Sequence, residues 1–233
     1  MKTLSDLLSP DEPAITLIRQ WVAEAEVPCE ILPPGESRAD TLIALQITTQ
    51  SPLGALAYET GGVLIDHGWL RCLGSGHPRL PRDLHTWNTG RTDGFSLIAD
   101  DVVGGFFALN GGALGPNPGQ VYYWPPDDLD WTALDMGSTE FLQSCLSGRL
   151  AAFYESLRWP GGERDVATLP GDRCFGFYPF LWTREGSIEG SHRAVLPVAE
   201  VFDLKVDLVR QLGSEGGLSP GGESARAKRR RLF

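Results

Sequence analysis

Residues 95–124 alternate short apolar runs with polar turns, and the other elements of the chain can be placed around this stretch. Its three runs, at residues 95–99, 105–109 and 121–124, are rich in aromatic and β-branched side chains, which favour strands. Between them lie the pair Asp100-Asp101 and the sequence Asn110-Gly111-Gly112, whose composition is typical of turns. The pattern predicts three neighbouring strands in the middle of a sheet.

A hairpin or bulged strand pair is predicted at residues 63–73, where two apolar runs flank Asp66-His67-Gly68. Residues 174–182 are aromatic enough to form a buried strand or a tightly packed segment. Ser51 followed by Pro52 is typical of a helix start and predicts a short helix over residues 52–60. The last helix is predicted over residues 198–212, with one apolar face made of Val201, Leu204, Leu208 and Leu212.

Strands gathered in the middle of the chain and helical stripes at both ends predict an α+β fold, with a central mixed or mainly antiparallel sheet flanked by helices. A chain of 233 residues can bury a sizeable core, and we predict a single globular domain over residues 3–212. Gly, Ser, Pro and charged residues then predominate. Because residues 213–233 cannot recover their ordering entropy by burial, they are predicted to form a disordered basic tail.

The distribution of charge narrows the classes of partner. The chain has 20 basic and 30 acidic side chains, but residues 214–233 hold five of the basic ones and two of the acidic ones, so the tail is +3 and the rest is −13. An acidic body repels phosphate backbones, which disfavours nucleic-acid binding by the folded part. The polar N-terminal sequence and the lack of an apolar run of about 20 residues predict a soluble cytoplasmic protein that does not contact membranes.

The residues that could carry chemistry are Asp66-His67 and Asp100-Asp101, which together could supply metal ligands or an acid and a base. Their spacing is not diagnostic, and the favoured alternative is that each pair satisfies backbone groups at a strand end. Arg71 is the nearest counter-charge, and its pairing with an aspartate would make the cluster structural. We assign no catalytic residue, no metal ligand and no cofactor; the four cysteines lack a CxxC spacing and are expected to be free thiols.

The most function-prone surface is predicted where the 63–73 hairpin meets the Asp100-Asp101 turn, because carboxylates and an imidazole crowded at strand ends repel one another unless they are solvated, paired or ligand-bound. The aromatic side chains near residue 124 could extend it as partner anchors, although core packing is their commoner use. The candidate binding residues are Asp66, His67, Trp69, Arg71, Asp100, Asp101, Asn110, Tyr123 and Trp124.

Several long motifs carry a resemblance to known families. They are LQITTQSPLGALAYETGGVLIDHGWLRCLGSG, ADDVVGGFFALNGGALG, VYYWPPDDLDW, FYESLRW and FYPFLW. With these motifs, residues 4–210 resemble an uncharacterised bacterial family, the domain of unknown function numbered twenty-six twenty-five, which implies no activity. The order of strands, Asn-Gly-Gly turn, tyrosine strand and Phe-Leu helix also resembles the SUKH superfamily of cell-wall-assembly regulators and toxin-immunity proteins. That resemblance implies an α+β fold that works by binding partners; residues 174–212 and the 66–69 hairpin turn depart from it.

Composition and resemblance together favour a non-catalytic protein-binding module, SUKH-like, with a role in toxin immunity or regulation. Its expected partner is a basic protein such as a toxin, since charge complementarity raises association rates. The alternative is a metal-assisted hydrolase or a small-ligand-binding protein that uses Asp66, His67, Asp100 and Asp101. The sequence leaves the oligomeric state open, and for residues 228–233, KRRRLF, a basic end without an address function is the favoured interpretation.

Overall fold

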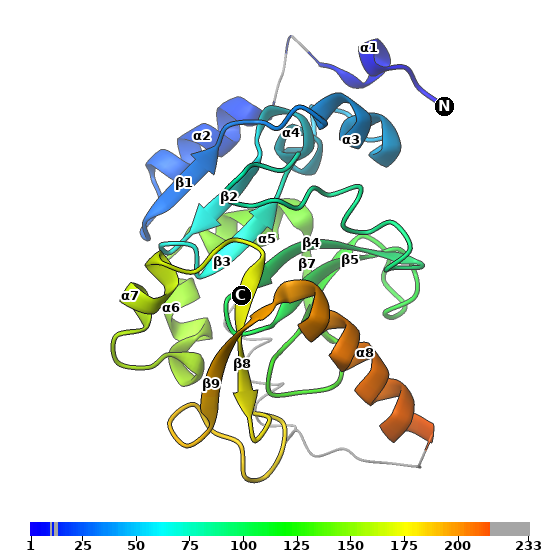
Figure 1. Cartoon of the computed structure of the whole chain (residues 1–233). Coiled ribbons are helices and arrows are strands. Elements are labelled where there is room, and N and C mark those ends of the chain that lie inside the picture. The colour runs from blue at the N-terminus through cyan, green and yellow to red at the C-terminus, as the bar shows by residue number, and fades with distance from the viewer. Residues whose placement is uncertain (10, 12–13, 215–233) are drawn as a thin grey trace.

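The computed structural model describes residues 1–9, 11 and 14–214, and it confirms the α+β fold (Figure 1). Strands occupy the middle of the chain, and helices precede and follow them. The elements are, in order, α1 (Leu4–Leu7), α2 (Ile15–Ala23), β1 (Cys29–Leu32), α3 (Arg38–Leu45), α4 (Pro52–Glu59), β2 (Gly62–Ile65), β3 (Leu70–Leu73), β4 (Phe95–Asp101), β5 (Phe106–Asn110), β6 (Gln120–Trp124), β7 (Thr132–Gly137), α5 (Ser138–Cys145), α6 (Arg149–Phe153), η1 (Glu155–Leu157), α7 (Gly162–Ala167), β8 (Arg173–Tyr178), β9 (His192–Pro197) and α8 (Val198–Ser214).

The main sheet has seven strands, whose spatial order β1 to β7 is also their order in the chain. Each strand pairs antiparallel with the next. The three predicted central runs are β4, β5 and β6, and the predicted hairpin is β2 and β3, so both predictions are confirmed. β4 lies at the centre of the strand order and carries Asp100 and Asp101, two of the residues on which the candidate chemistry depends.

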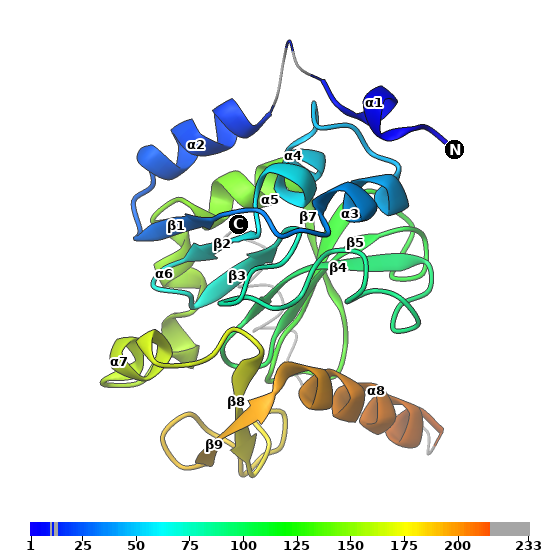
Figure 2. The same cartoon turned by 45° about the horizontal axis from the view of Figure 1, so that its top comes forward.

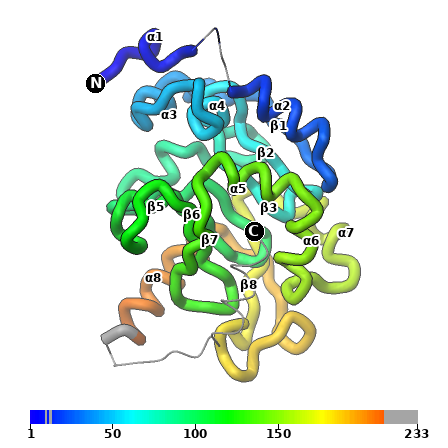
Figure 3. Tube along the Cα trace, turned by 180° about the vertical axis from the view of Figure 1, so that it is seen from behind, coloured from blue at the N-terminus to red at the C-terminus, as the bar shows by residue number. Residues whose placement is uncertain are grey.

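Both faces of this sheet are covered, as two neighbouring residues of β5 show. Successive side chains on a strand point to opposite faces. The Phe106 ring packs edge-on against Phe202 of α8, with 5.1 Å between ring centroids, while the Phe107 ring lies 4.9 Å from Phe141 of α5. Helix α8 therefore covers one face and α5 the other, as the front and back views show (Figures 1 and 3). Burial on both faces explains why the central strands are apolar almost throughout.

Helices α2 and α4 lie against the β1–β2 end of the sheet, where α2 contacts β1 and α4 contacts β2, while α3 packs on α4 and α1 on α3 (Figure 2). The short α1 begins with a capping box, because Thr3 and Asp6 satisfy each other's backbone N–H groups. At the start of α4, the Ser51 hydroxyl accepts a hydrogen bond from the Gly54 N–H at 3.1 Å, and Pro52 occupies the first helical position. The predicted helix over residues 52–60 is thus confirmed, ending one residue earlier.

A second, two-stranded sheet of β8 and β9 follows α7 and leads directly into α8. The Phe175 N–H donates a 2.7 Å hydrogen bond to the Val102 carbonyl, which attaches β8 to the turn after β4. The aromatic segment 174–182 was predicted as a strand or tightly packed segment and begins as β8. Neither α7 nor β9 was predicted.

Buried apolar side chains from Leu7 of α1 to Phe202 of α8 belong to one hydrophobic cluster. The single domain over residues 3–212 stays a prediction. Residues 215–233, which make up nearly all of the predicted tail, lie outside the described residues. Among the helices that are described, none is long and apolar enough to span a bilayer.

Candidate binding site

The Asp66-His67 pair belongs to the tight turn between β2 and β3. Asp66, His67 and Gly68 have φ angles of 53°, 59° and 89°, so three successive residues adopt left-handed backbone conformations. The Asp66 carboxylate pairs with the Arg158 guanidinium, which lies 4.4 Å above the ring of Trp69. His67 is exposed. Asp66 therefore attaches the turn to the segment before α7, and His67 forms part of the turn itself.

Asp100 and Asp101 do not form the turn that their composition predicted; that expectation is wrong, because β4 continues through both. In the β3–β4 register Arg71 faces Asp100 and Leu70 faces Asp101. Since side chains alternate along a strand, the two carboxylates point to opposite faces of the sheet. They do not converge on one centre, and each has its own partners.

Asp100 is the centre of a buried ion network. Arg71 forms an ion pair with one carboxylate oxygen, and Arg82 Nη1 lies 2.5 Å from the other. The three side chains are 2–6% exposed. The guanidinium groups also donate to backbone carbonyls, Arg71 to Arg173 at 2.6 Å and Arg82 to Gly171 at 2.7 Å. The network thus ties the main sheet to the segment that enters β8.

Asp101 accepts four hydrogen bonds on the opposite face. The Tyr123 and Tyr154 hydroxyls donate at 2.7 and 3.0 Å, and the backbone N–H groups of Gly105 and Val103 donate at 2.7 and 3.1 Å. Burial raises the pKa of Asp101 above its ordinary value of 3.8, and the hydrogen bonds from Tyr123, Gly105 and Tyr154 act in the opposite direction. The carboxyl group therefore closes the turn between β4 and β5 and joins that turn to β6 and the end of α6.

The remaining candidate residues are also held inside the fold. The Asn110 side chain closes the glycine-rich turn after β5 through four hydrogen bonds with backbone groups of residues 112–117. Asp66 is half-buried and His67 is exposed. The other seven candidates are buried: Trp69, Arg71, Asp100, Asp101, Asn110, Tyr123 and Trp124. Their role in binding stays a prediction, but most of them have no open path to a partner in this conformation.

The alternative of a metal site can be compared with the same geometry. Asp100 is engaged by two guanidinium groups, Asp101 by two hydroxyls and two amides, and Asp66 by Arg158. Among the residues that the structure describes, no group of three or more His, Cys, Asp and Glu side chains could hold a metal ion. The carboxylates that the sequence offered as ligands are thus spread over three separate networks.

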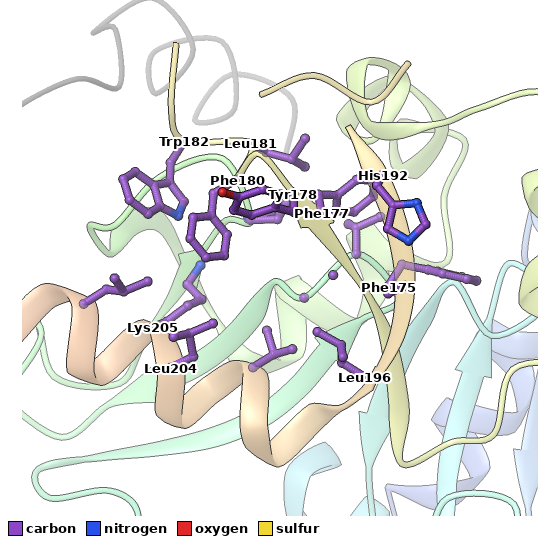
Figure 4. Close-up of a pocket in the computed structure, with 17 residues that line it drawn as sticks. Phe175, Phe177, Tyr178, Phe180, Leu181, Trp182, His192, Leu196, Leu204 and Lys205 are labelled. Carbon is purple, nitrogen blue, oxygen red and sulfur yellow. The ribbon is translucent and has the colours of Figure 1, made fainter. Parts of the chain in front are cut away.

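A different feature, an apolar pocket, lies between α8 and the small β8–β9 sheet (Figure 4). Its volume is about 170 Å³. Phe180 and Trp182, whose rings stack at 5.2 Å, lie on one side, and Leu204 lies on the facing helix. The residues that line it come from four parts of the chain: Val103, Gly104, Pro126, Phe175, Gly176, Phe177, Tyr178, Phe180, Leu181, Trp182, His192, Ala194, Leu196, Val201, Leu204, Lys205 and Leu208.

Lys205 is the buried cation of this pocket. Its ammonium group donates to the carbonyls of Pro125 and Asp128 at 2.5 and 3.3 Å, and it lies 4.7 Å from the ring centroid of Trp124. These contacts fix the turn after β6 against α8. His192, at the other end of the pocket, is exposed.

The surroundings of the pocket are apolar and acidic at the same time. Four of the six exposed large hydrophobic residues in the described part of the chain lie on β8, β9 and α8: Tyr178 (72% exposed), Val195 (51%), Leu204 (40%) and Val209 (38%). The same helix carries exposed acids at Glu200, Asp203 and Asp207. The sequence contained part of this information, because Val201, Leu204 and Leu208 were predicted as one apolar face and residues 174–182 as an aromatic segment.

Comparison with known proteins places the chain among uncharacterised relatives. YbfG of Escherichia coli (strain K12), an uncharacterised protein, is 45% identical over 213 residues, which cover 89% of this chain and 97% of YbfG. An uncharacterised protein of Haemophilus influenzae (strain ATCC 51907) is 45% identical over 223 residues, covering 88% of this chain and 98% of the relative. The family described as protein of unknown function DUF2625 matches residues 4–201. The chain therefore belongs to the DUF2625 family.

Proposed function

We propose that this protein is a non-catalytic protein-binding module whose binding site is the apolar pocket between α8 and the β8–β9 sheet. The observation that carries the proposal is that two exposed hydrophobic side chains, Tyr178 and Leu204, line this concave apolar surface together with further aromatic residues. Single exposed apolar residues are common on proteins, whereas a group around a concave surface marks a binding site. Tyr178 and the stacked pair Phe180 and Trp182 are the aromatic types that dominate protein interfaces.

The charge around the pocket supports a basic partner. Residues 1–213 carry 15 basic and 28 acidic side chains, and Glu200, Asp203 and Asp207 lie on the helix that lines the pocket. A basic protein would be attracted over several ångströms and would then place an apolar side chain in the pocket. The expected association is faster at low salt, because salt screens exposed charges beyond about 8–10 Å.

We extend the proposal to the biological role and the cellular location of the protein. Resemblance to the SUKH superfamily supports a role in immunity toward a basic toxin or in regulation, since proteins of that superfamily typically act by binding partners. The four free cysteines, of which three are buried, suit a reducing compartment and support a cytoplasmic location.

The test compares variants that change the pocket with a matched variant elsewhere. Leu204→Arg and Tyr178→Ala alter exposed pocket side chains, and Leu17→Arg alters a leucine of similar exposure (48%) on α2. Proteins captured by the wild type would be identified, purified and titrated against each variant by calorimetry. We expect about tenfold weaker binding for both pocket variants and unchanged binding for Leu17→Arg.

Equal binding by all three variants would refute the assignment of the pocket. A captured partner that is acidic, or a dissociation constant that does not rise with salt, would refute the basic partner. Circular dichroism spectra serve as the folding control for the variants. We expect all three variants to be folded, because all three positions are exposed.

A further inference from the structure

We infer that residues 226–233 of this same chain occupy the apolar pocket and cover it until a partner displaces them. The inference rests on the proposed function, because it concerns the same pocket and adds a way in which access to it is regulated. It also states what a partner must resemble: a basic run followed by apolar side chains.

The chemistry of the segment matches that of the pocket. Residues 226–233 read RAKRRRLF, so five basic side chains precede Leu232 and Phe233. The only other large apolar residue between 215 and 233 is Leu218. An aromatic and a branched aliphatic side chain suit a pocket lined by Phe180, Trp182 and Leu204.

The charges around the pocket suit the basic run. Glu200, Asp203 and Asp207 are exposed on α8, at positions interleaved with the pocket residues Val201 and Leu204. The Asp203 side chain is 64% exposed and its ion pair with Arg91 is long, at 3.9 Å. The Asp207 carboxylate pairs with Arg210 at 3.2 Å, and both side chains are exposed. Ion pairs of this kind are weak. A basic segment laid along this helix would therefore meet three exposed carboxylates whose present ion pairs it can replace, and the apolar pair that follows would reach the pocket.

The attachment point makes the docking local. α8 contributes Val201, Leu204, Lys205 and Leu208 to the pocket and ends at Ser214. From Leu208 to Ser214 the helix rises roughly 9 Å, whereas the eleven residues 215–225 can span up to about 36 Å when extended. Residues 226–233 can therefore return to the pocket. A segment tethered through a linker of this length meets its site at an effective concentration of about 1 mM, so a contact with a dissociation constant near 0.1 mM would be formed roughly nine-tenths of the time.

The test measures how fast a reagent reaches the pocket in the full chain. Leu204→Cys places a thiol at the pocket, and its alkylation by N-ethylmaleimide is followed by site-resolved mass spectrometry. Adding Leu232→Ser and Phe233→Ser should raise the alkylation rate at position 204 about tenfold, in line with the effective concentration above. Adding Leu218→Ser instead is the matched control and should leave that rate unchanged. The half-buried Cys29 on β1 is an internal reference whose rate should stay constant.

A second measurement locates the segment. A benzophenone side chain at position 233 should, on irradiation, crosslink within one molecule to residues 175–208. Crosslinks elsewhere, or crosslinks only between two molecules, would overturn the inference, and so would equal alkylation rates with and without the changes at 232 and 233.

Failure of this inference can be told apart from failure of the proposed function. If Leu204→Arg weakens partner binding while the serine changes leave alkylation unaffected, the pocket binds partners and the inference is wrong. If the serine changes accelerate alkylation but no partner depends on Leu204, residues 226–233 cover the pocket and the proposed function is wrong.

Discussion

At the scale of single residues, Asp101 connects several elements through one side chain. Its carboxyl group accepts hydrogen bonds from Tyr123 and Tyr154 and from two amides of the β4–β5 turn. Asp101→Asn turns one acceptor atom into a donor that faces donors, so we expect the free energy of unfolding to fall by about 1–3 kcal/mol. Thermal denaturation measures the loss. Asp93→Asn, at an exposed position, is the control and should change stability by no more than about 0.5 kcal/mol.

Partner binding should not change in Asp101→Asn, because the side chain is buried on the sheet face opposite the pocket. A variant of normal melting temperature that has lost binding would contradict the structural role of Asp101 and restore it as a site residue.

The raised pKa of Asp101 also predicts how stability depends on pH. A carboxyl group whose pKa is higher in the folded state binds its proton more tightly there than in the unfolded chain, where the value is near 3.8. Its contribution to stability is therefore complete below pH 3.8 and is lost as the pH rises through the raised value. The difference in unfolding free energy between wild type and Asp101→Asn should shrink over that interval, measured by urea titrations at a series of pH values. A difference that grows with pH would mean that the four hydrogen bonds, and not burial, dominate.

At the scale of elements, the β2–β3 turn holds a non-glycine residue in a left-handed backbone conformation, and a glycine at that position would remove the conformational free-energy cost. His67 has φ of 59° and is exposed, and a left-handed conformation costs a non-glycine residue about 1–2 kcal/mol. Because glycine loses more entropy on folding, we expect His67→Gly to raise the unfolding free energy by a net of about 0.5–1 kcal/mol. The melting temperature would then rise by roughly 1–4 °C.

The same variant tests the metal-dependent alternative. If His67 were a metal ligand, zinc, manganese or magnesium would raise the melting temperature of the wild type, and that increment would be absent in His67→Gly. We expect no increment in either protein.

The sequence predicted elements well where local preference and burial agree. β4, β5 and β6 coincide with the predicted runs to within two residues because aromatic and β-branched side chains fill both faces of a covered sheet. The sequence-based prediction failed where a residue far away in the chain determines the local structure. Acids are depleted in strands, but Arg71 and Arg82 on other segments allow β4 to include Asp100.

The candidate site shows the same limit. β9 is half-exposed and gains its hydrogen bonds by pairing with β8. The pattern of apolar and polar residues in β9 alone therefore does not predict a strand. The apolar face of α8 was predictable, but the pocket it faces combines residues near 103, 126 and 180 with the helix. No local pattern specifies that meeting.

At the scale of the whole molecule, the single hydrophobic cluster from α1 to α8 predicts one cooperative unit. Limited proteolysis of the native protein should leave a resistant core that ends near Gly213, identified by intact mass. Two resistant fragments of similar size would show two domains and would reject the prediction.

The order of the strands has a consequence for synthesis. Because β1 to β7 pair in chain order, each strand can pair with the one made before it, and the sheet can grow strand by strand during synthesis. The carbonyl partners of Arg82 and Arg71 arrive 89 and 102 residues later, at positions 171 and 173. At about 5–20 residues per second, the two guanidinium groups therefore wait roughly 5–20 s for these carbonyl partners while the sheet is being made. A chaperone that recognises incomplete sheets can bind during that interval. The interval ends when β8 packs against the main sheet.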